Sequence, residues 1–236
     1  MKRMQSVIMM IVFVALLSGC AATREAKSVE ASGFLAEYKS LLRPGERGEE
    51  VLLVYRKPDV NWASYNKILL EPVTLWHSPD EQYSPEQQED LQKLADSFFD
   101  LLVQKLSTNY QMVDKPLPDT MRFQVALVHG EEASTGLSFT SKVIPQLRML
   151  QGAWTFYSDR PVFTGGITVE FKIKNARTGE LLAAGADKRV GGQKLFDKNV
   201  FNSWGDVKNA LTYWADFAQY RLCVFSKKGE CAEPKA

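Results

Sequence analysis

The sequence is poor in the side chains on which most catalytic and metal sites depend. Its 236 residues include only two histidines, His77 and His129, and three cysteines. A Ser-His-acid triad needs a nucleophile held within about 3 Å of its base, and no GxSxG elbow or similar motif presents one. We therefore interpret both histidines as surface or strand-end residues, and we predict a protein that is not an enzyme and has no metal or cofactor.

Other catalytic patterns have a simpler interpretation. The pairs Gly165–Gly166 and Gly191–Gly192 lack the longer glycine spacing of a phosphate-binding loop. Adjacent carboxylates at Glu49–Glu50 and Glu131–Glu132 point to different sides of an extended chain, so they do not form the facing pair of a glycosidase. We interpret all four pairs as turns and solvated loops.

Long apolar runs are missing beyond the N-terminus. Two basic residues near the start precede a run from Ser6 to Leu17 that is dominated by Val, Ile, Met, Phe, Ala and Leu. A helix that spans a bilayer needs about 20 apolar residues, whereas this chain becomes polar at Thr23. The order of charged, apolar and small residues is typical of an export signal, so we predict a signal peptide at residues 1–19.

The predicted cleavage site resembles that of bacterial lipoproteins. Leu17, Ser18, Gly19 and Cys20 match the lipobox in residue type, spacing and position. The resemblance implies that Cys20 carries acyl chains, and two such chains suffice for stable membrane anchoring. No aspartate follows Cys20 to resemble the inner-membrane retention signal. We therefore expect a lipid anchor in the outer membrane, on its periplasmic face; the alternative is a secretory signal beside a chance cysteine.

Charge and length favour one exported domain. Removal of residues 1–19 leaves 27 basic and 28 acidic residues, from totals of 29 and 28, so nothing calls for nucleic acid as a partner. Residues 20–32 are small and mostly polar, and we predict a flexible tether with a reach of about 40 Å. Residues 33–236 are long enough for one periplasmic domain with a sizeable core.

Cys223 and Cys231 lie close together near the C-terminus. In an oxidising periplasm such a pair usually forms a disulfide, which we predict here. Closing so short a loop stabilises a fold by about 2 to 3 kcal/mol, enough to hold a tail in place. A metal site is the alternative, although neither a histidine nor a third thiol lies nearby.

Two long amphipathic helices are predicted. The first runs from Ser84 to about Thr108, with Ser84 as N-cap, Pro85 at the first helical position and Gln87 two residues further. Its apolar stripe consists of Leu91, Leu94, Ala95, Phe98, Leu101, Leu102 and Leu106. The second begins near Ser203, and its apolar residues are Val207, Ala210, Leu211, Trp214, Phe217 and Ala218.

Extended patterns lie between and around these helices. Tyr65–Val73 has the apolar centre of a buried strand, and residues 121–129 alternate apolar and polar side chains. The turn NARTGE joins an alternating strand that begins at Ile167 to the segment LLAAGADKRV, which predicts a hairpin. Residues 130–165 predict a long, partly helical insertion. The sum is an α+β fold, a single domain with one mixed β-sheet covered by two long helices.

The segments SGFLAEYKSLLRPG, YNKILLEPV and TGELLAAGADKRV together resemble a family of Gram-negative lipoproteins known only as a domain of unknown function. More loosely, the layout is similar to lipoprotein domains of the curli-secretion and peptidoglycan-synthase-activator type. That resemblance implies a non-catalytic interaction module, with an envelope protein or peptidoglycan as partner.

Aromatic residues in the insertion give the one candidate binding surface. Trp154, Phe156, Tyr157 and Phe163 lie in the segment without a clear pattern. Aromatic side chains exposed on a loop often anchor an interface, although core packing is the alternative. Two other functions fit the sequence as alternatives: a hydrolase of the cell envelope, and a carrier of a lipid or small apolar ligand.

Overall fold

Three long antiparallel strands form the centre of the β-sheet. They are β7 (Thr120–Val128), β9 (Ile167–Asn175) and β10 (Leu181–Gly191), and each pairs with the next along most of its length. The predicted hairpin is confirmed, because the turn between β9 and β10 closes at Gly179, whose φ of 75° suits a residue without a side chain. Apolar residues of β7 and β9 alternate as predicted, so one sheet face is strongly apolar.

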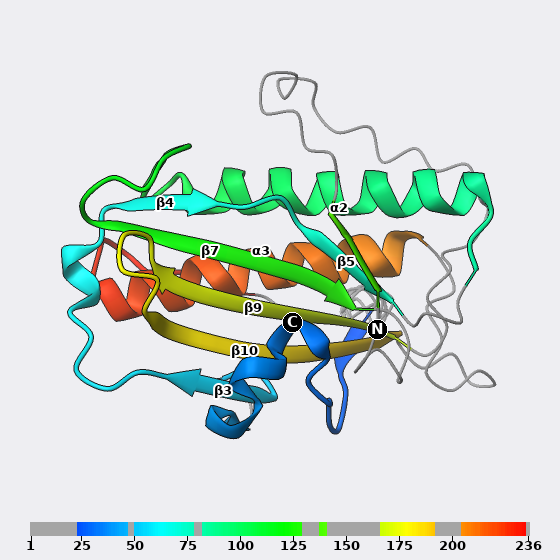
Figure 1. Cartoon of the computed structure of the whole chain (residues 1–236), viewed down its shortest axis with the longest axis horizontal. Helices are drawn as coiled ribbons and strands as arrows, with labels where there is room; N and C mark the ends of the chain where they lie inside the picture. Colours follow the sequence, from blue (N-terminus) through cyan, green and yellow to red (C-terminus); the bar gives the residue numbers. More distant parts are fainter. Residues whose placement is uncertain are drawn as a thin grey trace, which may run out of the picture.

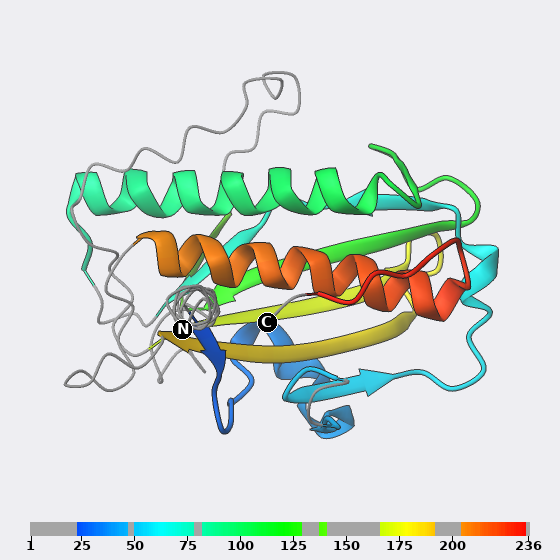
Figure 2. The same cartoon turned by 180° about the vertical axis from the view of Figure 1, so that it is seen from behind.

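The computed structural model describes residues 23–46, 50–77, 82–128, 137–140, 166–191 and 204–234. In these residues a mixed ten-stranded sheet carries two long helices on one face (Figures 1 and 2). The main path of the sheet runs β2-β3-β10-β9-β7-β4-β6, from β2 (Arg43–Pro44) and β3 (Leu53–Arg56) to β6 (Gln111–Met112). The predicted α+β fold class is confirmed.

One stretch of extended chain supplies two strands beside β7. β4 (Lys67–Leu70) and then β5 (Thr74–His77) both pair with β7 in parallel, and β5 also pairs with β8 (Leu137–Thr140). Pro72 lies between them and has no N–H to donate, which fits the break in the ladder. The sequence did not predict β5, and His77 is its last residue, which agrees with our interpretation of this histidine as a strand-end residue.

The two helices are placed as the sequence predicts. α2 (Pro85–Leu106) begins with a capping box in which Ser84 and Gln87 exchange hydrogen bonds. α3 (Trp204–Ser226) packs beside it on the same face of the sheet (Figure 2). The rings of Phe98 and Trp214, one from each helix, lie 6.5 Å apart. The main core fills the space between this helical layer and the sheet.

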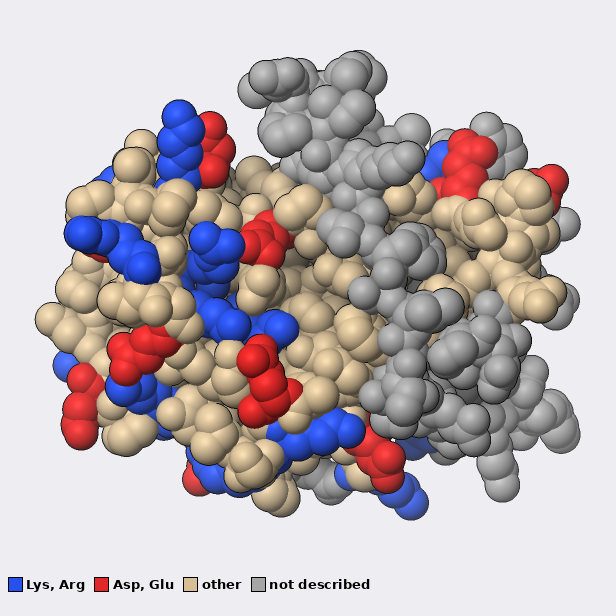
Figure 3. Space-filling view, viewed as in Figure 1, with Lys and Arg blue, Asp and Glu red and all other residues tan. Residues whose placement is uncertain are grey.

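The first residues that the structure describes lie on the opposite face of the sheet and at its edge. The 3-10 helix η1 (Gly33–Leu41) lies on it, and β1 (Thr23–Glu25) pairs with the end of β10. The predicted flexible tether is therefore wrong for residues 23–32, because Thr23 and Ser32 are buried and Ser32 is bound to a carboxylate of the sheet. The remainder of this face carries Lys, Arg, Asp and Glu side chains side by side (Figure 3).

Candidate functional site

An apolar cavity of about 90 Å³ lies between the helices and the sheet. Its floor consists of two rows of paired residues that face the helices. The outer row is Arg56, Ala183, Ile173 and Phe123, from strands β3, β10, β9 and β7 in that order. The inner row is Val54, Gly185, Phe171 and Val125 from the same strands, and of these Gly185 alone does not line the cavity.

Helical residues roof this cavity. α3 contributes Trp214, Phe217, Ala218, Arg221, Leu222 and Phe225, and α2 contributes Phe98 and Leu102. Interiors are normally packed to the density of organic crystals, so a void of this size is notable. Small side chains line it from both layers, Ala183 from the sheet and Ala218 from the helix.

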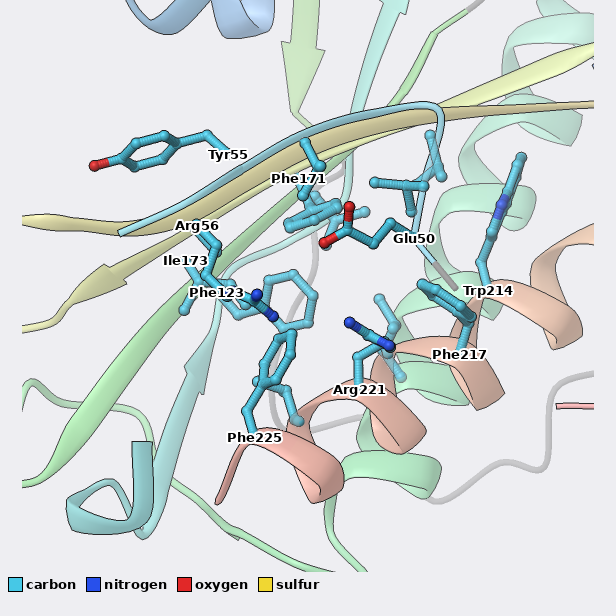
Figure 4. A pocket seen from close by; sticks show the side chains of 18 of the residues that line it. Glu50, Tyr55, Arg56, Phe123, Phe171, Ile173, Trp214, Phe217, Arg221 and Phe225 are labelled. Carbon is cyan, nitrogen blue, oxygen red and sulfur yellow. The ribbon is translucent and has the colours of Figure 1, made fainter. Parts of the chain in front are cut away.

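Charged side chains gather at one end of the cavity. Figure 4 shows the carboxylate of Glu50 and the guanidinium groups of Arg56 and Arg221 directed toward the same space, while Tyr55 points away. The Cζ atoms of both arginines lie 4.9 Å from the centroid of the Phe225 ring. This end, defined by Glu50, Arg56, Arg221 and Phe225, is called the mouth below.

Glu50 at the mouth is neutralised by a different arginine. Arg43 donates to both of its carboxylate oxygens, across 2.9 and 3.2 Å. Burial raises the pKa of Glu50, but the hydrogen bonds from Arg43 and from the backbone N–H of Glu46, together with the positive charges of Arg43 and Arg56, outweigh it and hold the pKa below its usual value. Within the part of the chain that the structure describes, neither Arg56 nor Arg221 has an ion-pair partner within 4.0 Å.

Trp214, which lines the cavity, forms a buried polar pair with Asp187 behind it. The indole Nε1–H of Trp214 donates to Oδ2 of Asp187 across 2.7 Å, and Asp187 is 3% exposed. Burial raises the pKa of Asp187 to about 6, although the hydrogen bond from Trp214 opposes the shift. Its other oxygen, Oδ1, has no hydrogen-bond partner among the described residues.

Beside this pair, Arg189 fixes the start of the described chain. Its side chain is buried at 4% exposure and donates from Nε and Nη2 to Thr23, at 3.1 and 3.2 Å. Its Cζ atom also lies 3.9 Å from the centroid of the Tyr213 ring. The guanidinium therefore joins β1, β10 and α3 behind the cavity.

The cavity combines an apolar lining with charged side chains at one end, an arrangement that is suited to binding. Among the residues that the structure describes, no group of three or more His, Cys, Asp or Glu side chains is placed to hold a metal ion. His77 lies with its ring centroid 5.2 Å from that of Tyr83. In the same residues, no helix has the length and apolar character needed to cross a bilayer.

The predicted disulfide is confirmed, since Cys223 and Cys231 are bonded. Cys223 lies in the last turns of α3, between Arg221 and Phe225, and Cys231 lies in the tail that follows the helix. Cys20, His129 and the predicted surface of Trp154, Phe156, Tyr157 and Phe163 lie outside the described residues.

The sequence analysis did not predict the cavity, although one signal for it exists. Phe217, Arg221 and Phe225 are spaced four residues apart and so share a face of α3. A charge inside an otherwise apolar stripe indicates a polar edge to the buried surface. Arg56 and the small Ala183 gave no comparable signal, because their role depends on pairing between distant strands.

A family model described as "Protein of unknown function (DUF3313)" matches residues 30–218. A comparison with curated proteins found no match. The chain is similar to the crystal structure of a DUF4136 family protein from Bacteroides thetaiotaomicron VPI-5482, with 11% identity, a TM-score of 0.38, and coverage of 73% of this chain and 95% of that one. It is also similar to the PelC dodecamer from Paraburkholderia phytofirmans, with 10% identity, a TM-score of 0.31, and coverage of 67% and 88%.

Proposed function

The chain belongs to the DUF3313 family, and from the cavity that its fold builds we propose that it is a lipid-anchored, non-catalytic binding protein of the cell envelope. The cavity is the ligand site in this proposal. Its ligand is a molecule that inserts an apolar group between α3 and the sheet. The anchor is the acylated Cys20, and the compartment is the periplasmic side of the outer membrane.

The observation that best supports this proposal is the apolar lining of the cavity. Phe98, Val125, Phe171 and Trp214 are among the side chains that surround it, and the charges lie at its mouth. Apolar cavities of about 150 Å³ in other proteins stay dry and bind benzene. A cavity of about 90 Å³ suits a smaller apolar group, such as the end of an alkyl chain or one side chain of an envelope protein.

The pairing of β1 supports a short distance between anchor and domain. Only two residues separate Cys20 from Thr23, which is already bound to the sheet. At about 3.5 Å per residue, these positions span about 10 Å at most. A lipid on Cys20 therefore holds the domain close to the membrane surface, with the end of the sheet that contains Thr23 and Gly191 facing it.

A titration with 1-octanol tests the cavity as a ligand site. We expect the full chain in phosphatidylcholine nanodiscs to bind 1-octanol beyond the uptake of empty nanodiscs. Ala218→Leu fills the cavity from α3 and removes this binding, whereas Ala232→Leu, at an exposed position in the C-terminal tail, leaves it unchanged. Chemical denaturation checks that both variants are folded. If both are folded and bind 1-octanol equally well, the cavity is not the site.

Cell fractionation tests the anchor separately. We expect the wild-type chain in the outer-membrane fraction with acyl chains on residue 20, and Cys20→Ala without them. Recovery of a wild-type chain that is soluble and carries a free thiol at Cys20 contradicts the anchor, whatever the outcome of the octanol titration.

A further inference from the structure

We propose that the mouth is a head-group site, so that the ligand is an anionic amphiphile with a single alkyl chain and a terminal carboxylate. The carboxylate binds Arg56 and Arg221, and the alkyl chain enters the cavity. This inference rests on the proposed function and adds the charge and chemical class of the ligand.

The two guanidinium groups are placed close enough together to bind one ligand. Both Cζ atoms lie 4.9 Å from the same point, the centroid of the Phe225 ring, so they are at most about 10 Å apart. Stacking on an aromatic face leaves the edge of a guanidinium free to donate hydrogen bonds. Figure 4 shows the guanidinium groups of both side chains directed into the same space between the sheet and α3.

Charge balance at the mouth is the second step. Arg43 and Glu50 neutralise each other through two hydrogen bonds. The described neighbours Lys57 and Glu180 are likewise paired with each other. Arg56 and Arg221 also belong to the mouth, where Glu50 is the one carboxylate among the described residues that line the cavity, so an excess of positive charge remains there. An anion is the complementary ligand, and guanidinium groups suit the two oxygens of a carboxylate.

The contrast between mouth and interior is the third step. The side chains behind the two arginines are almost entirely apolar, with Ile173 and Phe123 in the same row of the floor as Arg56. A molecule that is charged throughout gains nothing from this interior, and a molecule without charge gains nothing from the arginines. A carboxylate with one alkyl chain uses both, and the small volume disfavours a second chain.

Binding of three probes, each with a chain of eight carbons, tests the inference. The measurements use the same nanodiscs, and Ala218→Leu is the blank for partitioning into lipid. We expect octanoate to bind at least about tenfold more tightly than 1-octanol, because it adds charge-assisted hydrogen bonds. Octyltrimethylammonium binds more weakly than either. From hexanoate to octanoate each methylene that enters the cavity strengthens binding about fourfold, until the cavity is filled.

Substitution of the arginines identifies the head-group site. We expect Arg56→Gln and Arg221→Gln each to weaken octanoate binding about tenfold and to leave 1-octanol binding unchanged. Arg177→Gln is the matched control, since Arg177 is exposed in the β9–β10 turn. Raising the salt concentration weakens the binding of octanoate but not of 1-octanol.

The outcomes separate this inference from the proposed function. Equal affinity for octanoate and 1-octanol, or arginine variants that bind octanoate like the wild type, overturns the head-group site and leaves the cavity as an apolar binding site. Failure of all three probes to bind overturns both. Loss of octanoate binding in Arg177→Gln to the same degree as in Arg221→Gln also overturns the site, because it indicates a general effect of charge.

Discussion

Trp214 of α3 donates its indole N–H to the carboxylate of Asp187 on β10 across 2.7 Å, behind the apolar cavity. The carboxylate is buried, and its second oxygen has no hydrogen-bond partner among the residues described. This hydrogen bond connects α3, which roofs the cavity, to strand β10 of the sheet. It also places a charge that is poorly solvated in the core, so the pair bears on both geometry and stability.

Asp187→Asn should stabilise the protein at neutral pH. The pKa of Asp187 is raised from 3.8 to about 6 by burial. Between these values the unfolded chain has lost its proton while the folded chain keeps it, so stability falls as pH rises and stays lower above about 6. The asparagine carbonyl still accepts from Trp214. We expect a gain of up to about 3 kcal/mol at pH 7 and little gain at pH 3.5.

Urea denaturation of both proteins at the two pH values measures this difference. Asp114→Asn is the control, because Asp114 is exposed. A variant that is destabilised equally at both pH values contradicts the prediction and indicates that the added amide N–H groups find no acceptor.

Ser32→Ala should loosen the first described residues from the sheet. The backbone N–H and the hydroxyl of Ser32 donate to the two carboxylate oxygens of Glu170, at 2.5 and 2.7 Å, and Glu170 is fully buried. The same hydroxyl accepts from the N–H of Phe34 at the start of η1. Removing it leaves a buried carboxylate oxygen without a donor, at a cost of about 1 to 3 kcal/mol.

Hydrogen exchange locates this effect. We expect faster exchange in η1 and unchanged exchange in α2, whereas Ser64→Ala, at an exposed hydroxyl, alters neither. Uniform acceleration in both helices argues against a local role for Ser32.

Cys231→Ala should destabilise the fold by about 2 to 3 kcal/mol, the value expected for closing a loop whose ends are 8 residues apart. The loop keeps further attachments through Lys228. Its Nζ donates to Asn66 Oδ1 at 2.7 Å and to the carbonyl of Tyr65, and its carbonyl accepts from Asn109 Nδ2 at 3.3 Å. For this reason we expect α3 to keep its position. A reducing agent should lower the stability of the wild type to that of the variant and leave the variant unchanged. A larger loss, with melting of α3, contradicts this account.

Local signals in the sequence account for most of the fold but for little of the site. The capping box at Ser84 and the alternation along β9 depend on neighbouring residues, so both elements were predictable. The segment that contains Ser32 is small and polar, and nothing local shows that its partner is Glu170, 138 residues away. Arg56 and Arg221 likewise meet only through the packing of α3 on β3, and Phe225 brings them together.

The pairing of β1 with β10 predicts which end of the domain contacts lipid. β1 pairs with the last residues of β10, and the β9–β10 turn lies at the other end of that strand of 11 residues, about 35 Å away. Cys20 lies three positions before Thr23. Under the proposal that Cys20 is acylated, we expect a benzophenone side chain in place of Arg24 to crosslink to phospholipid. The same group in place of Thr178, in the turn, should not crosslink to phospholipid.

Inserting ten Gly and Ser residues between Ala22 and Thr23 should reduce crosslinking at position 24 without changing stability, because the longer tether lets the domain move away from the membrane. Equal crosslinking at both positions means that the domain lies along the membrane, and crosslinking at position 178 alone reverses the orientation.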